Sequence, residues 1–125
     1  MTTLPAGFPT GCPAKIPGVR ACANDVVYRF TQNPPSAGDL LSYAELGRQV
    51  RQSLSQAAVC KSHGISVFTD TRDANHFRGL QPNGGGQHMA TATLTQADGL
   101  VAKTGKLSHH TWWPFDGTDR VALFK

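Results

Sequence analysis

The sequence has few acidic residues and no long hydrophobic run, and each shortage excludes a class of protein. Glutamate occurs once in 125 residues, as Glu45, so no pair of glutamates is available for acid–base catalysis. The apolar runs are far shorter than the roughly 20 residues that cross a bilayer, so we expect no membrane partner. The first residues do not place an apolar segment after a basic one, as a secretory signal does, and this predicts a cytoplasmic protein.

Cysteine is also scarce. The three cysteines are Cys12, Cys22 and Cys60, and no two of them form a C-x-x-C pair. The sequence therefore predicts neither a disulfide framework nor a zinc site, with a Cys12–Cys22 bridge as the less favoured alternative. We expect Cys60 to pack on the apolar side of a helix, and we expect no bound metal.

The overall composition is that of one small folded domain. Hydrophobic residues make up 39% of the chain and charged residues 16%, which is apolar enough for a packed core. The net charge of +4 favours anionic partners. The lysines and arginines are scattered along the chain, however, so nucleic acid is a less favoured partner than a nucleotide.

Proline and glycine divide the chain into two parts. Residues 1–24 are rich in both, which disfavours helix and central strand and predicts an irregular N-terminal arm. Residues 25–125 are predicted to form a single α+β domain with a small mixed or antiparallel sheet. Alternating or β-branched patterns predict strands at 26–30, 65–69, 88–94, around 100–101 and at 121–124.

Helix signals follow the first and second predicted strands. Two capping-box patterns, Ser36-x-x-Asp39 and Ser42-x-x-Glu45, indicate that helix begins in this region. A stripe of apolar residues then predicts one or two helices that end near Gly64; it consists of Leu46, Val50, Leu54, Ala57 and Ala58. Acidic residues at 70 and 73 and a glycine at 79 predict a short helix after the second strand.

Two glycine-containing segments are predicted to be turns or loops. The run Gly84–Gly86 leads into a predicted strand, whereas a phosphate-binding P-loop leads into a helix, so a flexible loop is the preferred interpretation. The pair Asp98-Gly99 is typical of a β-hairpin turn.

Residues 108–117 hold both tryptophans and two of the five histidines. If this segment is extended, His109, Thr111 and Trp113 point one way while His110 and Trp112 point the other. Adjacent histidines then cannot easily share a metal, and the segment either packs in the core or forms a wall on which a planar ring stacks. No G-x-S-x-G pattern is present, so the sequence does not predict a serine hydrolase.

The order of these elements resembles that of ADP-ribosyltransferases. The resemblance covers about residues 26–95 and depends on Tyr28-Arg29 in the first strand and on Gly64–Asp70, which runs into a helix with Ala74 and Phe77. It implies NAD as the substrate, with Arg29 at its ribose or phosphate and with Ser66 or Phe68 lining the nicotinamide pocket. Tyr28 and Trp112 are further candidates for cofactor binding, Trp112 as part of the wall on which a ring stacks. The family's late catalytic glutamate is absent here, so either His109 or His110 takes a catalytic role beside Arg29 or the domain binds without transferring.

These patterns predict a small NAD- or nucleotide-binding domain that resembles ADP-ribosyltransferases and acts as a bacterial toxin effector. Whether it is an enzyme stays open. The alternative is a non-catalytic interaction module, such as an immunity, antitoxin or phage-type accessory protein, that docks on a protein partner through its Trp-rich segment. A third possibility is a nucleic-acid binder in which Trp112, Trp113 and Phe115 stack on bases.

Overall fold

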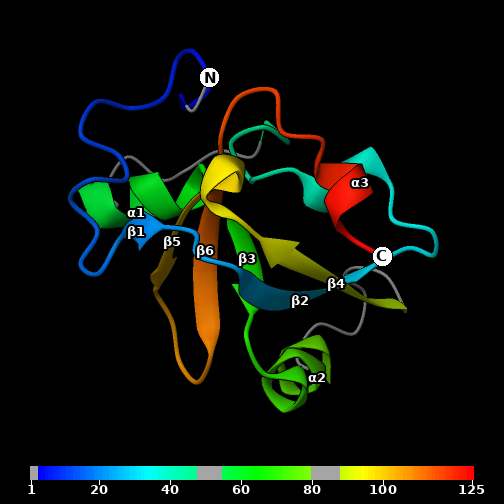
Figure 1. Ribbon diagram of the computed structural model, residues 1–125. Helices are drawn as coiled ribbons and strands as arrows, with labels where there is room; N and C mark the ends of the chain where they lie inside the picture. Colours follow the sequence, from blue (N-terminus) through cyan, green and yellow to red (C-terminus); the bar gives the residue numbers. More distant parts are fainter. Residues whose placement is uncertain (1–2, 48–54, 80–87) are drawn as a thin grey trace.

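A six-stranded antiparallel sheet organises the chain (Figure 1). The structure is a computed structural model that describes residues 3–47, 55–79 and 88–125. The strand order is β1-β5-β6-β3-β2-β4, which confirms the predicted α+β class. In chain order the elements are β1 (Arg20–Ala21), β2 (Asp25–Thr31), the 3-10 helix η1 (Ala37–Leu40), α1 (Gln56–Ser62), β3 (Ile65–Phe68), α2 (Thr71–Gly79), β4 (His88–Leu94), the 3-10 helix η2 (Gln96–Asp98), β5 (Gly99–Lys103), β6 (His109–Pro114) and α3 (Arg120–Leu123).

The central strands and α2 lie where the sequence predicts them, but two predictions near the end of the chain are wrong. Residues 121–124 are not a strand, because the Asp119 side chain accepts a hydrogen bond from the Ala122 amide at 3.2 Å and caps α3. Asp98-Gly99 does not turn a hairpin, because β4 and β5 are not neighbours in the sheet. Instead, Gly99 adopts a φ of 136° where it passes closely over the Trp113 backbone.

The two capping boxes form, although only one of them starts a helix. Ser36 and Asp39 cap η1 as predicted. Ser42 and Glu45 also exchange hydrogen bonds, of 2.9 and 3.1 Å, but they close a turn. Residues 48–54 and the Gly84–Gly86 run lie outside the described residues, so those parts of the predicted stripe and loop stay predictions. The described helix α1 begins after Ser55, whose hydroxyl accepts from the Ala58 amide.

Each face of the sheet has its own apolar core. Trp112 packs on one face, within a cluster of buried residues: Cys22, Val27, Leu40, Ile65, Val67, Ala90, Ala92, Leu94, Val101 and Phe124. Trp113 packs on the other face against Cys12, Ile16, Cys60 and Ala102. The predicted alternation along β6 is therefore confirmed. Both indole N–H groups donate to backbone carbonyls, of Asp98 and Cys60 respectively, as buried tryptophan requires.

The N-terminal arm covers the Trp113 core and is joined to it by a disulfide. Cys12 and Cys60 are bonded, with their Cα atoms 5.2 Å apart, so the prediction of no disulfide is wrong. A Cys12–Cys22 bridge is also excluded, because Cys22 is buried as a free thiol in the opposite core. The arm also supplies β1, which pairs with β5. Sequence spacing alone missed the bridge because its cysteines are 48 residues apart.

None of the helices in the described ranges has the length and apolar character that a bilayer-spanning helix needs.

We expect loss of the Cys12–Cys60 bond to destabilise the protein. Closing a loop of this length restricts the unfolded chain, which the chain-entropy model values at about 4 kcal/mol. Dithiothreitol should therefore lower the melting temperature of the wild type in a thermal unfolding experiment. The double variant Cys12→Ser/Cys60→Ser should melt at that lower temperature with or without dithiothreitol. An effect of dithiothreitol on the double variant would contradict this explanation.

Gly64 is expected to tolerate no side chain. A Cβ at this position would overlap the Thr111 methyl group and lie 2.9 Å from the Trp113 indole nitrogen. Gly64→Ala should therefore lower the free energy of unfolding by about 1–3 kcal/mol in a urea titration. Gly38→Ala is the matched control, because its new methyl would meet only one atom at 4.0 Å. Equal effects of the two substitutions would show that the close packing at Gly64 is unimportant.

Candidate functional site

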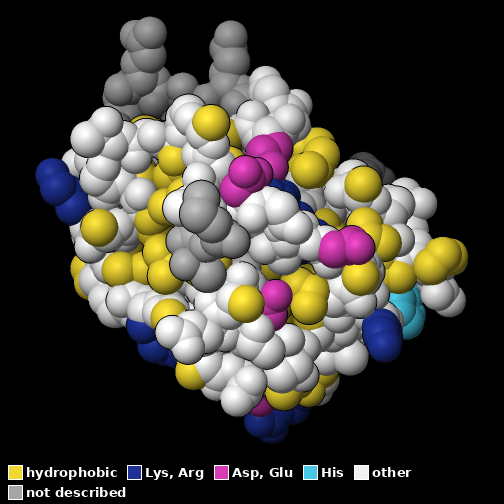
Figure 2. Space-filling model, turned by 45° about the horizontal axis from the view of Figure 1, so that its top comes forward, with side chains coloured by type: hydrophobic (Ala, Val, Ile, Leu, Met, Phe, Trp, Pro, Cys, Tyr) yellow, Lys and Arg dark blue, Asp and Glu magenta, His cyan; other side chains and the backbone are white. Residues whose placement is uncertain are grey.

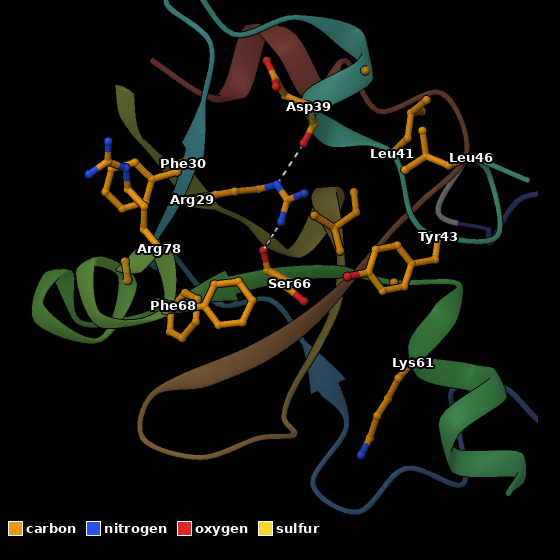
Figure 3. A pocket seen from close by; sticks show the side chains of 15 residues that line it. Arg29, Phe30, Asp39, Leu41, Tyr43, Leu46, Lys61, Ser66, Phe68 and Arg78 are labelled. Carbon is orange, nitrogen blue, oxygen red and sulfur yellow. Dashed lines mark hydrogen bonds between the residues drawn. The ribbon is translucent and has the colours of Figure 1, made fainter. Parts of the chain in front are cut away.

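A pocket opens where β2 and β3 separate (Figure 3). These strands share a single residue pair, Tyr28 with Phe68. Beyond this pair the Arg29 side chain lies between the strands, and the pocket extends from there toward η1, α1 and α2. Its volume is about 290 Å³. It is lined by Arg29, Phe30, Gly38, Asp39, Leu41, Tyr43, Leu46, Lys61, Gly64, Ile65, Ser66, Phe68, Ala74, Phe77 and Arg78.

Arg29 is a largely buried cation without a carboxylate partner in the described part of the chain. Its Nε donates to the Asp39 carbonyl at 2.8 Å and its Nη1 to the Ser66 carbonyl at 2.7 Å. Nη2 makes no hydrogen bond to a described residue. Because no fully buried side-chain nitrogen among those residues lacks a partner, Nη2 must reach the pocket or solvent. Burial lowers the pKa of Arg29, and the Tyr43 and Asp39 side chains oppose this lowering only in part.

Other charges of the pocket are mostly positive. Arg78 of α2 lies over the Phe30 ring, 5.1 Å from its centroid, and Lys61 of α1 lies at the rim. Among the described residues of the lining, Asp39 is the only acidic one. Its carboxylate accepts from the Ser36 amide, the Ser36 hydroxyl and the Gln32 amide, which lowers its pKa against the opposing effect of burial. Asp39 thus presents its carbonyl to Arg29 and uses its carboxylate in the cap of η1.

Aromatic rings form the apolar part of the wall. Phe68 and Phe77 pack with centroids 5.3 Å apart between β3 and α2. The Tyr43 ring lies across the pocket with its hydroxyl directed toward Ser66 (Figure 3). Rings beside cations suit a ligand that has both a planar group and a negative charge.

Ser66 and His109 come together on the pocket face of the sheet. Ser66 is paired with Thr111 across β3 and β6, which makes His109 its diagonal neighbour on the same face. The Ser66 hydroxyl and His109 Nε2 are 3.0 Å apart. On the other side of the ring, Nδ1 lies 3.2 Å from the Thr104 hydroxyl, which is 2.7 Å from the Thr111 hydroxyl. Both ring nitrogens therefore have a hydroxyl partner.

His109 is held in its neutral form by its surroundings. Burial lowers its pKa, and positive groups on four elements act in the same direction: His110, Lys61, Arg29 and Lys103. The edge of its ring contacts Phe68, with centroids 5.3 Å apart. A neutral imidazole can accept the proton of a hydroxyl, which an imidazolium cannot.

Four of the seven residues that the sequence assigns to the site come together. Arg29, Ser66 and Phe68 line the pocket, and His109 contacts Ser66. The sequence analysis did not assign Lys61, Tyr43, Arg78 or Thr104, because their proximity depends on how α1, α2 and β5 pack rather than on a local pattern.

The other three assigned residues lie away from the pocket, which corrects their expected roles. Trp112 is fully buried in the core on the opposite face, because alternation along β6 directs it there. His110 follows the same alternation, and its Nδ1 lies 2.7 Å from the Ser108 carbonyl. Tyr28 pairs with Phe68 at the closed end of the opening and is not part of the lining.

No late acid replaces the missing glutamate within the described residues. Asp119 caps α3, and the Asp116 amide donates to the Thr3 carbonyl, so both belong to other parts of the fold. The single glutamate, Glu45, forms an ion pair with Arg120. Over the same residues, no three histidine, cysteine or acidic side chains gather as metal ligands would.

We expect His109 to make the folded state less stable in acid. Its pKa in the fold lies below the ordinary 6.5, so the unfolded chain binds the proton more tightly. As the pH falls through 6.5, the wild type should lose stability relative to His109→Gln until the folded pKa is reached. Urea titrations of both proteins at pH 7.5 and 5.5 measure the difference. Identical pH dependence in the two proteins would contradict the lowered pKa.

Comparisons with known proteins give no relative for this chain: no family model, no curated protein and no solved structure matches it.

Proposed function

We propose that the protein binds a nucleotide, NAD among them, in the pocket at Arg29. The observation that carries the proposal is the Arg29 guanidinium, a buried cation held by two carbonyls without a carboxylate partner among the described residues. Removing a charge from water without pairing it is costly, and an anionic ligand offsets that cost. The guanidinium also suits the oxygens of a phosphate better than an ammonium does, because it donates from a planar fork.

The size and the walls of the pocket favour a mononucleotide or one half of NAD. About 290 Å³ is at the lower end for small-molecule sites. The Phe68 and Phe77 rings offer an apolar surface to a base or nicotinamide, while Arg29 and Arg78 lie on the side where a phosphate would be held. In this arrangement the ring of the ligand would pack on Phe68 and Phe77, and its phosphate would lie beside Arg29.

The proposed activity is binding rather than ADP-ribosyl transfer. The ADP-ribosyl transfer that the resemblance implies needs a carboxylate near the ribose. The only acid of the described lining is Asp39, and its carboxylate is bonded into the cap of η1. The role of toxin effector depends on that resemblance alone. The cytoplasmic location stays a prediction, and the Cys12–Cys60 bond favours an oxidising compartment instead.

The two alternative functions, docking on a protein partner and binding nucleic acid, both depend on exposed tryptophans. Trp112 and Trp113 are both 0% exposed, so neither can dock on a protein partner or stack on a nucleic-acid base. Figure 2 shows most lysines and arginines of one face standing apart near its outline, with acidic side chains nearer the middle. A nucleic acid would require a continuous positive track on that face.

Isothermal titration calorimetry with NAD, AMP and adenosine tests the proposal. AMP should bind and adenosine should bind at least tenfold more weakly, because only AMP has the phosphate for Arg29. The variant Arg29→Lys keeps the charge but loses the two-carbonyl fork, and we expect it to weaken AMP binding at least tenfold.

Arg72→Lys is the matched control. Arg72 is exposed on α2, pairs with Asp70 and is not part of the lining, so its replacement should leave AMP affinity unchanged. If neither NAD nor AMP binds at millimolar concentration, the proposal is wrong. It also fails if both variants weaken AMP binding equally.

A further inference from the structure

The contact between Ser66 and His109 has a second implication, independent of which ligand fills the pocket. A hydroxyl within hydrogen-bond distance of a neutral imidazole, with that imidazole oriented by a third group, is the arrangement that activates a serine nucleophile. Here the distances are 3.0 Å from Ser66 to Nε2 and 3.2 Å from Nδ1 to Thr104. No local motif predicts a contact between these two residues, since 43 residues separate them.

The ring of His109 is fixed as well as bonded. Gly105 lies so close that a Cβ there would come within 2.7 Å of Nδ1. Phe68 packs against the ring from β3, and Thr111 holds Thr104 at 2.7 Å. The imidazole therefore faces Ser66 in a defined orientation, which a general base requires.

The Ser66 side of the pair is open to a ligand. Ser66 is half-buried and belongs to the pocket lining, so a small molecule in the pocket reaches it. The Arg29 guanidinium donates to the Ser66 carbonyl at 2.7 Å, which places a positive charge beside the hydroxyl. A charge in that position stabilises negative charge that develops on a substrate oxygen.

We propose that Ser66 is a nucleophile activated by His109, and that this pair cleaves a carboxylic ester or thioester that carries an anionic group. That the substrate carries an anionic group rests on the proposed function above. The activation of Ser66 by His109 is independent of it. Two orientations of the Thr104 hydroxyl are possible, and the productive one leaves Nε2 free to accept the Ser66 proton.

The reaction balances with water as the only co-reactant. The Ser66 oxygen forms a bond to the carbonyl carbon as its proton moves to His109 Nε2. The bond from that carbon to the alcohol or thiol breaks, and the leaving group takes the proton from His109. Water then attacks the acyl-serine, gives one proton through His109 to the Ser66 oxygen and releases the carboxylic acid.

A fluorophosphonate probe tests the nucleophile directly, because it phosphonylates activated serines with release of fluoride. We expect mass spectrometry of the wild type to locate the adduct on Ser66, and no adduct at that site in Ser66→Ala. His109→Gln should slow labelling at least tenfold. Gly105→Ala should also slow it, since the new methyl displaces the His109 ring, while Ser55→Ala in the cap of α1 should label as the wild type does.

The outcomes separate this proposal from nucleotide binding. If the folded wild type forms no adduct on Ser66, or if His109→Gln labels equally fast, the nucleophile proposal is wrong. Calorimetry of the wild type with AMP measures the anion site separately from the labelling of Ser66. Labelling of Ser66 without AMP binding would overturn only the proposal of nucleotide binding. AMP binding without labelling would overturn only the proposal that Ser66 is a nucleophile.

Discussion

The pocket depends on the position of one guanidinium. Arg29 lies where β2 and β3 stop pairing, and it joins β3 and η1 through the carbonyls of Ser66 and Asp39. Without it, those carbonyls would lose donors at a place where the sheet ladder supplies none. Because the Arg29 guanidinium lies there, the opening between the strands is polar and positively charged and is not filled by apolar core residues. The same side chain thus stabilises the gap and places a positive charge in it.

The disulfide-linked arm helps to fix the elements that lead into the site. Cys12 bonds to Cys60 at the end of α1, and the Trp113 indole donates to the Cys60 carbonyl at 2.9 Å. These contacts fix α1 on the sheet and hence the following turn at Gly64, from which β3 starts. Ser66 is two residues further on. The position of the pocket hydroxyl is therefore set partly by a segment whose described residues have no regular structure apart from β1.

Local patterns predicted β2, β3, β4, β5 and α2 because those signals are short-range: alternation in β4, and acidic residues with a closing glycine in α2. They did not predict β1, and they left open whether the segment of β6 is extended. They failed at residues 121–124, where a single cap from Asp119 outweighs β-branched residues, and at Cys12–Cys60, where the partners are distant in sequence. For the candidate site, residue type and strand position selected Arg29, Ser66 and His109, which the fold brings together. Trp112 lies on the other face, because stacking chemistry alone does not tell which face of β6 a ring occupies. Neighbours such as Thr104 depend on sheet order, which no local pattern contains.

The single pair between Tyr28 and Phe68 also has a mechanical consequence. It divides the sheet into two rigid parts, β1-β5-β6-β3 and β2-β4, that meet at one point of backbone pairing. No other backbone ladder joins the two parts among the described residues. Arg29 belongs to β2 and donates to the Ser66 carbonyl of β3, so this side chain is a second connection between the two parts. Any molecule that bonded to both strands would add a further one.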